Sequence, residues 1–238
     1  MGLFDRFRKG NKTNNKSNCE NSQKSDMFLY TEEELDQYEA YISEQFGGCA
    51  EVFHEIISPD IHLDILIIPP TEKSNYYKLI TMGMGAFPMN VPNELKRYEL
   101  ERAELILYLP PTWNIKSGRE EDYWPIRQLK VLGRLPITCD TWLGFGHTVS
   151  SDAENTPYAD NTKFCSMMLL TGVNPELKAL DFRFQSLGKL NFYQLFPLYK
   201  EELEYKQNHD AQALLELFDD SDIMPIINIE RKNYGLNA

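Results

Sequence analysis

Residues with the potential for catalysis are gathered in one short stretch of this 238-residue chain. Cys139, Asp140 and His147 lie close together in sequence, and a thiol, a carboxylate and an imidazole can form the nucleophile and base of a thiol hydrolase. Their spacing matches no local signature of that chemistry, and nearness along the chain does not establish nearness in space. We therefore rank catalysis below binding for this stretch.

A second candidate pair, His62 and Asp64, falls on a predicted strand. Residues two apart on a strand point to the same face, and we interpret this face as exposed to solvent. His62 and His147 would need further ligands to hold a metal ion, and none stands out, so neither a metal nor a cofactor is expected. The sequence also lacks a Walker loop, GxSxG, HExxH and a GxGxxG after a strand.

The same stretch carries an aromatic, glycine-containing loop that reads DTWLGFGH. Loops are normally polar, so this composition indicates either a buried turn or a recognition surface. Large amphipathic side chains dominate interface energetics. The candidate protein-binding residues are therefore Trp113, Asp140, Trp142, Phe145 and His147. Trp142 can equally be a core residue, and His147 a structural histidine with hydrogen-bond partners.

The elements that would position these residues follow from sequence periodicity. A helix is predicted from the capping box of Thr31 and Glu34 to Phe46, and a second over 122–134 leads into the aromatic loop. Further helices are expected at 198–207 and 210–218, and strands at 61–67, 76–82, 103–109, 164–170, 190–195 and 223–230. Strands grouped with interspersed helices indicate an α+β fold, with a mixed, largely antiparallel sheet and flanking helices.

Charge and composition limit the function further. The chain has 36 acidic and 24 basic residues, a net charge of −12, which disfavours nucleic-acid binding and favours a basic protein partner. The alternative is that this charge only maintains solubility. No apolar run approaches the roughly 20 residues of a membrane-spanning helix, and no secretory signal is visible, so we expect a cytoplasmic protein without stable membrane association.

The N-terminal segment differs in composition from the rest of the chain. Residues 1–26 are rich in Asn, Lys and Ser, so we predict a disordered tail, followed by an ordered domain over residues 27–238. The tail begins MGLFDRFRKG, a short basic amphipathic sequence that can adsorb weakly to a membrane or to a partner groove.

Three blocks in the same order carry a family resemblance: YYKLITMGMGAFPM from Tyr76, WPIRQLKVLGRLPITCDTWLGFGHT from Trp124 and PLYKEELEY from Pro197. With these blocks the chain resembles the suppressor-of-fused domain family from roughly His62 to Asn233. The resemblance implies the same α+β architecture and a protein-binding scaffold. Animal members grip a transcription-factor peptide between two domains, and this chain covers only the N-terminal one, so that clamp is not carried over.

Single-domain members of this kind look bacterial, and many are similar to immunity proteins. The resemblance therefore implies stoichiometric binding and neutralisation of a cognate toxin, an activity without catalysis. Two alternatives stay open: a cytoplasmic adaptor or scaffold, and a hydrolase that uses Cys139 or His147.

Overall fold

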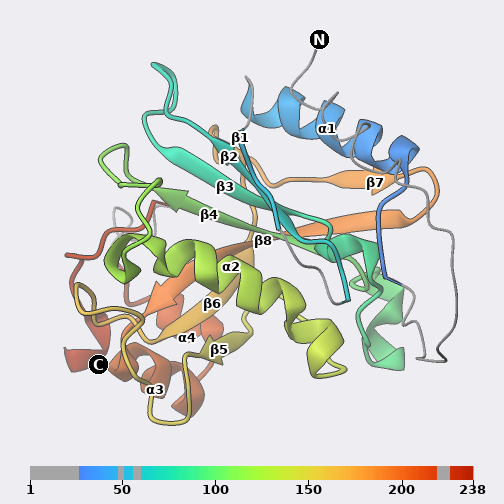
Figure 1. Ribbon diagram of the computed structural model, residues 1–238. Coiled ribbons are helices and arrows are strands. Elements are labelled where there is room, and N and C mark those ends of the chain that lie inside the picture. Colours follow the sequence, from blue (N-terminus) through green and yellow to red (C-terminus); the bar gives the residue numbers. More distant parts are fainter. Residues whose placement is uncertain (1–26, 48–50, 56–59, 219–225, 238) are drawn as a thin grey trace, which may run out of the picture.

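The structure is a computed structural model that describes residues 27–47, 51–55, 60–218 and 226–237 (Figure 1). The predicted disordered tail, with its MGLFDRF start, lies outside the described residues. The described helices are α1 (Glu32–Phe46), α2 (Glu120–Thr138), α3 (Lys200–Asn208) and α4 (Ala211–Leu215), with 3₁₀ turns η2 (Met84–Ala86), η3 (Asn93–Tyr98) and η4 (Tyr234–Asn237). None of the described helices is both long and apolar enough to cross a membrane.

A mixed sheet of eight strands forms the centre of the described chain, in the order β1-β2-β3-β4-β8-β6-β5, with β7 paired to β8. The strands are β1 (Glu51–Phe53), β2 (Asp64–Ile68), β3 (Tyr77–Met82), β4 (Ala103–Leu109), β5 (Thr148–Ser150), β6 (Ser166–Thr171), β7 (Phe182–Phe184) and β8 (Gly188–Leu198). Among these strands only β4 and β8 pair in parallel, with Ala103 opposite Asn191. The predicted α+β class and largely antiparallel sheet are confirmed.

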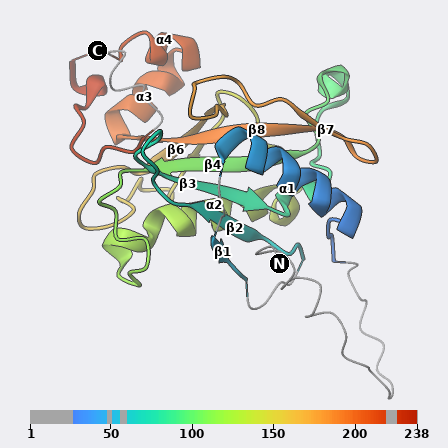
Figure 2. The ribbon, with the colours of Figure 1, turned by 90° about the horizontal axis from the view of Figure 1, so that it is seen from above.

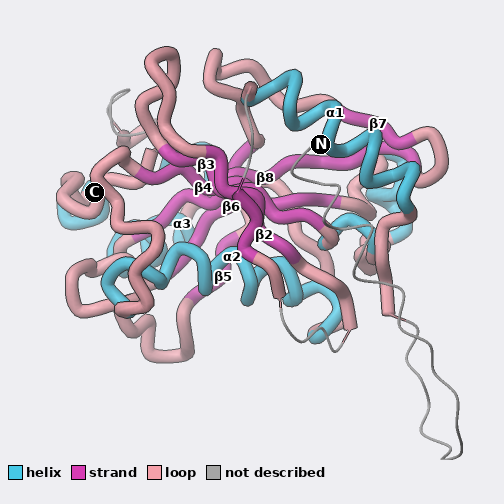
Figure 3. Tube along the Cα trace, turned by 45° about the horizontal axis from the view of Figure 1, so that its top comes forward, coloured by secondary structure: helices cyan, strands magenta, loops and turns pink. Residues whose placement is uncertain are grey.

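Helices cover both faces of the sheet, α1 on one side and α2 on the other (Figure 3). Leu105 and Leu107 of β4 join Leu129 of α2 in one core, whereas Ile106 joins Tyr38 of α1 in the other. The helices α3 and α4 lie together near the C-terminal end of the chain (Figure 2). Each strand residue of β4 is therefore buried, whichever face it occupies.

This two-sided cover corrects one interpretation from the sequence. The strand expected at 61–67 begins at Asp64 and is buried at every position, so Asp64 does not face solvent. A further difference concerns the strand expected at 223–230. Its first residues lie outside the described part of the chain, and within 226–230 the structure has an isolated bridge between Tyr108 and Ile226 instead of a strand.

Burial of Glu104 on β4 is compensated by a set of donors. Its carboxylate accepts hydrogen bonds from the Tyr30 hydroxyl at 2.8 Å, the Thr81 hydroxyl at 2.5 Å, and the backbone N–H groups of Gly83 and Gly85 at 2.9 and 3.1 Å. Burial nevertheless raises the pKa of Glu104 above its ordinary value. The residue fixes η2 and the segment before α1 to the sheet.

The C-terminal segment is anchored by a buried ion pair. Arg231 donates two hydrogen bonds to the Glu202 carboxylate of α3, both at 2.6 Å, and the two side chains are 3% and 0% exposed. The guanidinium also donates to the Pro197 carbonyl at 2.7 Å and lies over the ring of Phe164, among others, at 5.0 Å. This pair holds the last described segment against α3 and β8.

Candidate functional site

The helix α2 separates the predicted binding residues into two places. Four of them, Asp140, Trp142, Phe145 and His147, follow its C-terminal end, and we call them the loop surface. Trp113 instead packs at the other end, where its indole N–H donates to the Asp122 carbonyl at 2.8 Å. The 19 residues of α2 rise by about 28 Å in total, so Trp113 is not part of the loop surface.

The loop is fixed by its backbone. Asp140 and Gly146 have positive φ angles of 47° and 77°, which turn the chain sharply at both ends of the loop. The Gly146 N–H donates to the Leu169 carbonyl of β6 at 2.8 Å, and the His147 N–H donates to Gly144 at 3.1 Å. The conformation is therefore set by the sheet beside it.

Aromatic side chains in this loop have different exposures. Phe145 is 54% exposed, Leu143 is buried at 2%, and Trp142 is half-buried against the α2 core. The Trp142 ring meets the His147 ring edge-on, with centroids 4.3 Å apart. A Cβ at Gly144 would lie 2.5 Å from the Trp142 ring, so the absence of a side chain there allows the ring to approach the backbone closely.

The loop surface contains two polar side chains, His147 and Asp140. Burial, and then the charge of Lys206, lower the pKa of His147, while a hydrogen bond with the Trp142 backbone acts in the opposite direction. The imidazole is therefore neutral at neutral pH. The exposed Asp140 carboxylate accepts a hydrogen bond from the Asn90 amide at 3.1 Å.

The thiol-hydrolase arrangement, which was the alternative to binding, is not assembled in the described part of the chain. The Cys139 thiol is exposed, and its contact is with the Thr138 hydroxyl at 3.8 Å. Among the described residues, neither this thiol nor the Asp140 carboxylate hydrogen-bonds to His147. The base therefore lacks contact with the candidate nucleophile.

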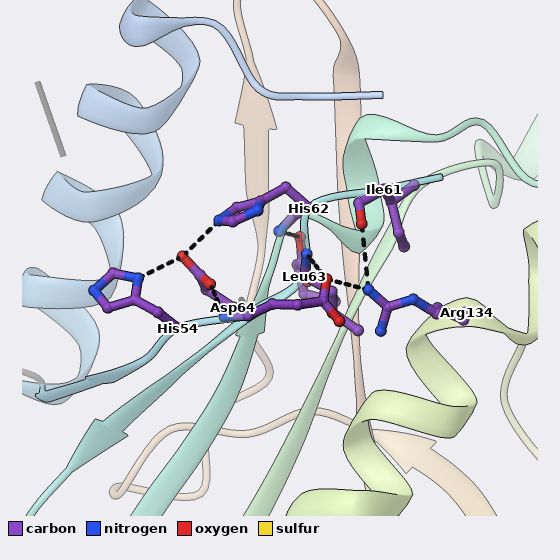
Figure 4. A network of polar contacts seen from close by, with 9 residues as sticks. His54, Ile61, His62, Leu63, Asp64 and Arg134 are labelled. Carbon is purple, nitrogen blue, oxygen red and sulfur yellow. Dashed lines mark hydrogen bonds and ion pairs between the residues drawn. The ribbon is translucent and has the colours of Figure 1, made fainter. Parts of the chain in front are cut away.

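Asp64 is the centre of a separate polar network that links two histidines (Figure 4). Its Oδ2 lies 3.2 Å from Nδ1 of His54 and 3.2 Å from Nε2 of His62, and its Oδ1 accepts the Glu55 N–H at 2.9 Å. Burial alone would raise the pKa of Asp64, but the bonds from His62 and the Glu55 N–H lower it overall. The bond to Asp64 in turn raises the pKa of His62, against the effect of burial.

Arg134 extends this network to α2. Its guanidinium pairs with Glu55 and lies 3.4 Å from Asp60. The network thus joins α2 to the chain that leads into β2, and His62 faces Asp64, not His147. Among the described residues no group of three or more His, Cys, Asp or Glu side chains is placed to hold a metal ion. Sequence reasoning missed His54, which lies ten residues before Asp64 outside any recognised motif, and Arg134, whose partner Glu55 is 79 residues away in sequence.

Comparisons with known proteins identify relatives of this chain in sequence and in fold. The protein UU111 of Ureaplasma parvum serovar 3 (strain ATCC 700970) is 26% identical over 210 residues, which span 87% of this chain and 98% of that protein. A crystal structure of a suppressor-of-fused homologue from Neisseria gonorrhoeae FA 1090 matches with a TM-score of 0.58 at 14% identity, covering 84% of this chain and 95% of that one.

The structure of a Sufu–Fu complex matches with a TM-score of 0.57 at 14% identity, and it covers 84% of this chain and 90% of that one. At such identity these structures establish the shared fold. A family model described as suppressor of fused protein matches residues 59–232, which is most of the chain. The chain therefore belongs to the suppressor of fused family.

Proposed function

We propose that this protein neutralises a bacterial toxin by binding it stoichiometrically through the loop surface. The observation that carries the proposal is the 54% exposure of Phe145 on a loop whose backbone is hydrogen-bonded to β6. An aromatic side chain presented on a fixed loop loses little further entropy on binding, and this is how an interface anchor gains affinity.

The neighbouring side chains support the same use of the loop. Trp142 and His147 contact each other edge-on in the same loop, and the neutral imidazole adds no charge that would have to be desolvated. The exposed Asp140 carboxylate can meet a cationic group at the rim.

Family and charge point to a protein partner. A Sufu protein of the same fold has been crystallised in complex with Fu, so that protein binds another polypeptide. The net charge of −12 would accelerate the encounter with a basic protein, and salt would screen this effect.

The test begins with the product of the gene that lies next to this one. Co-expression should give a stable one-to-one complex on pull-down and should rescue growth from the toxicity of that product. Absence of a complex together with absence of rescue would reject the proposal.

Substitution of Phe145 then locates the surface. Phe145→Ala should cost on the order of 2 kcal/mol of binding, roughly a thirtyfold faster dissociation, because it deletes an exposed anchor and disturbs no core contact. Leu177→Ala is the matched control, since Leu177 is 52% exposed on a different loop. Equal dissociation rates for the two variants would place the partner elsewhere.

A further inference from the structure

Three adjoining hollows lie at the end of α2 that is opposite to the loop surface. Their volumes are about 490, 340 and 520 Å³. Asn161 and Ile229 line both the first and the second, and Asp160 lines both the second and the third. We call these three hollows together the acidic groove.

The first hollow combines an apolar wall with carboxylates. Trp113, Ile226 and Ile229 line it together with Glu121 and Asp122 from the first turn of α2. The indole of Trp113 is held in place by its bond to the Asp122 carbonyl at 2.8 Å. The wall is therefore built before any ligand arrives.

The two carboxylates are not equally engaged within the protein. Asp122 pairs with Arg119 at 3.1 Å. Glu121 is half-buried, and its carboxylate forms no hydrogen bond or ion pair among the described residues. Acidic residues in the first turn of a helix interact favourably with its dipole, which accounts for their presence but not for an apolar wall in the same hollow as Glu121.

Carboxylates outnumber cations along the whole lining of the acidic groove. Its lining carboxylates are Glu120, Glu121, Asp122, Asp160 and Glu230, whereas its cations are Lys163 and Arg231. Three of these charges are already paired inside the protein: Arg231 with Glu202, Glu120 with Arg127 and Asp122 with Arg119. Glu121, Asp160 and Glu230 then stand against Lys163. The groove is therefore anionic, and a nucleic acid would be repelled from it.

We infer that the acidic groove binds an extended cationic segment of a partner protein. A Lys or Arg side chain of that segment occupies the first hollow, with its charged head at Glu121 and its aliphatic stem along Trp113 and Ile229. Long basic side chains match such a site because their stems are apolar and their heads are charged. Three hollows that share lining residues offer more space than one side chain fills, which favours a polypeptide over a free amino acid. This inference uses a separate surface and does not rest on the proposed function.

The test uses the full chain and a defined probe, the fluorescent peptide acetyl-Leu-Arg-Lys-Leu-Arg-amide, with acetyl-Leu-Glu-Glu-Leu-Glu-amide as the charge-reversed control. We expect the first peptide to bind with an affinity that falls as salt rises, and the second not to bind. In ¹⁵N-labelled protein the indole signal of Trp113, one of three tryptophans, should shift. The signal of Trp113 is identified as the one that is missing from the spectrum of Trp113→Phe.

Glu121→Gln should weaken the cationic peptide roughly fivefold, the upper range for one incompletely buried charge pair. Glu94→Gln, an exposed glutamate on η3, should leave binding unchanged. Equal affinity for wild type and Glu121→Gln, or an unshifted Trp113 signal, would overturn the inference. A shift of that signal in Arg6→Gln/Arg8→Gln protein without peptide would also overturn it, because the chain's own N-terminal segment would then be the occupant.

Discussion

Removal of the Arg231 guanidinium provides the sharpest test of what holds the C-terminal segment. Arg231→Met keeps an apolar stem among the surrounding rings but leaves the Glu202 carboxylate, which is 0% exposed, without its cation. The variant also leaves the Pro197 carbonyl without its donor at 2.7 Å. Breaking a buried pair from one side costs about 3–5 kcal/mol, because the remaining charge stays desolvated.

The measurement is the free energy of unfolding from urea titration, followed by circular dichroism and tryptophan fluorescence. Arg183→Met is the matched control, because Arg183 forms a comparable two-bond pair with Glu99 at 2.8 and 2.6 Å while both side chains are at least half exposed. We expect an unfolding midpoint close to wild type for the control and a large loss for Arg231→Met. Similar midpoints for the two variants would refute the reasoning. Glu202→Gln/Arg231→Met should recover part of the loss, since no buried charge remains.

Three further outcomes follow from the structure. Asp64 raises the pKa of His62 in the folded state. The interaction therefore stabilises the protein fully below pH 6.5, and this stabilisation is lost as pH rises through the raised pKa. In urea titrations, the difference in free energy of unfolding between wild type and His62→Gln should shrink from pH 5.5 to pH 8.5. Gly83→Ala should unfold at markedly lower temperature in calorimetry, because its Cβ would lie 1.9 Å from the His62 carbonyl oxygen at a φ of 119°. In thiol titration with a disulfide reagent, Cys139→Ser should remove one rapidly reacting thiol. Cys165→Ser should remove none, since burial raises the pKa of Cys165 to about 11.

Sequence patterns predicted helices and strands correctly where the whole pattern lies within one short segment. The capping box of Thr31 and Glu34 is present at the start of α1, and β4 occupies its predicted range of 103–109 before Pro110. The short strands β1, β5 and β7 were not predicted, because three residues are too few to establish an alternating pattern.

The burial of acidic residues could not be predicted from the alternation of one strand. Asp64 has partners nearby in sequence, His54 and His62, but its burial depends on helices packed over both faces of the sheet. Glu104 depends on Tyr30 and on N–H groups of η2, which come from other segments. An acidic residue in a strand normally indicates a solvent face, and only the cover of α1 and α2 over both faces reverses that interpretation. Trp113 was named beside the residues of the aromatic loop as a candidate for protein binding, and the structure places it at the other end of α2.

The parallel pairing of β4 with β8 has a consequence for synthesis on the ribosome. The strands β1 to β4 pair with strands that are adjacent in sequence, whereas Ala103 of β4 can pair with Asn191 only after β8 has been synthesised. Closing so long a loop is entropically slow, so this joint should form late. Until β8 has left the exit tunnel, the nascent chain presents the apolar strand β4 as an open edge, the kind of edge that recruits other chains. Translational pauses between β4 and β8 would therefore favour aggregation, and a chaperone that shields β4 would raise the yield of folded protein.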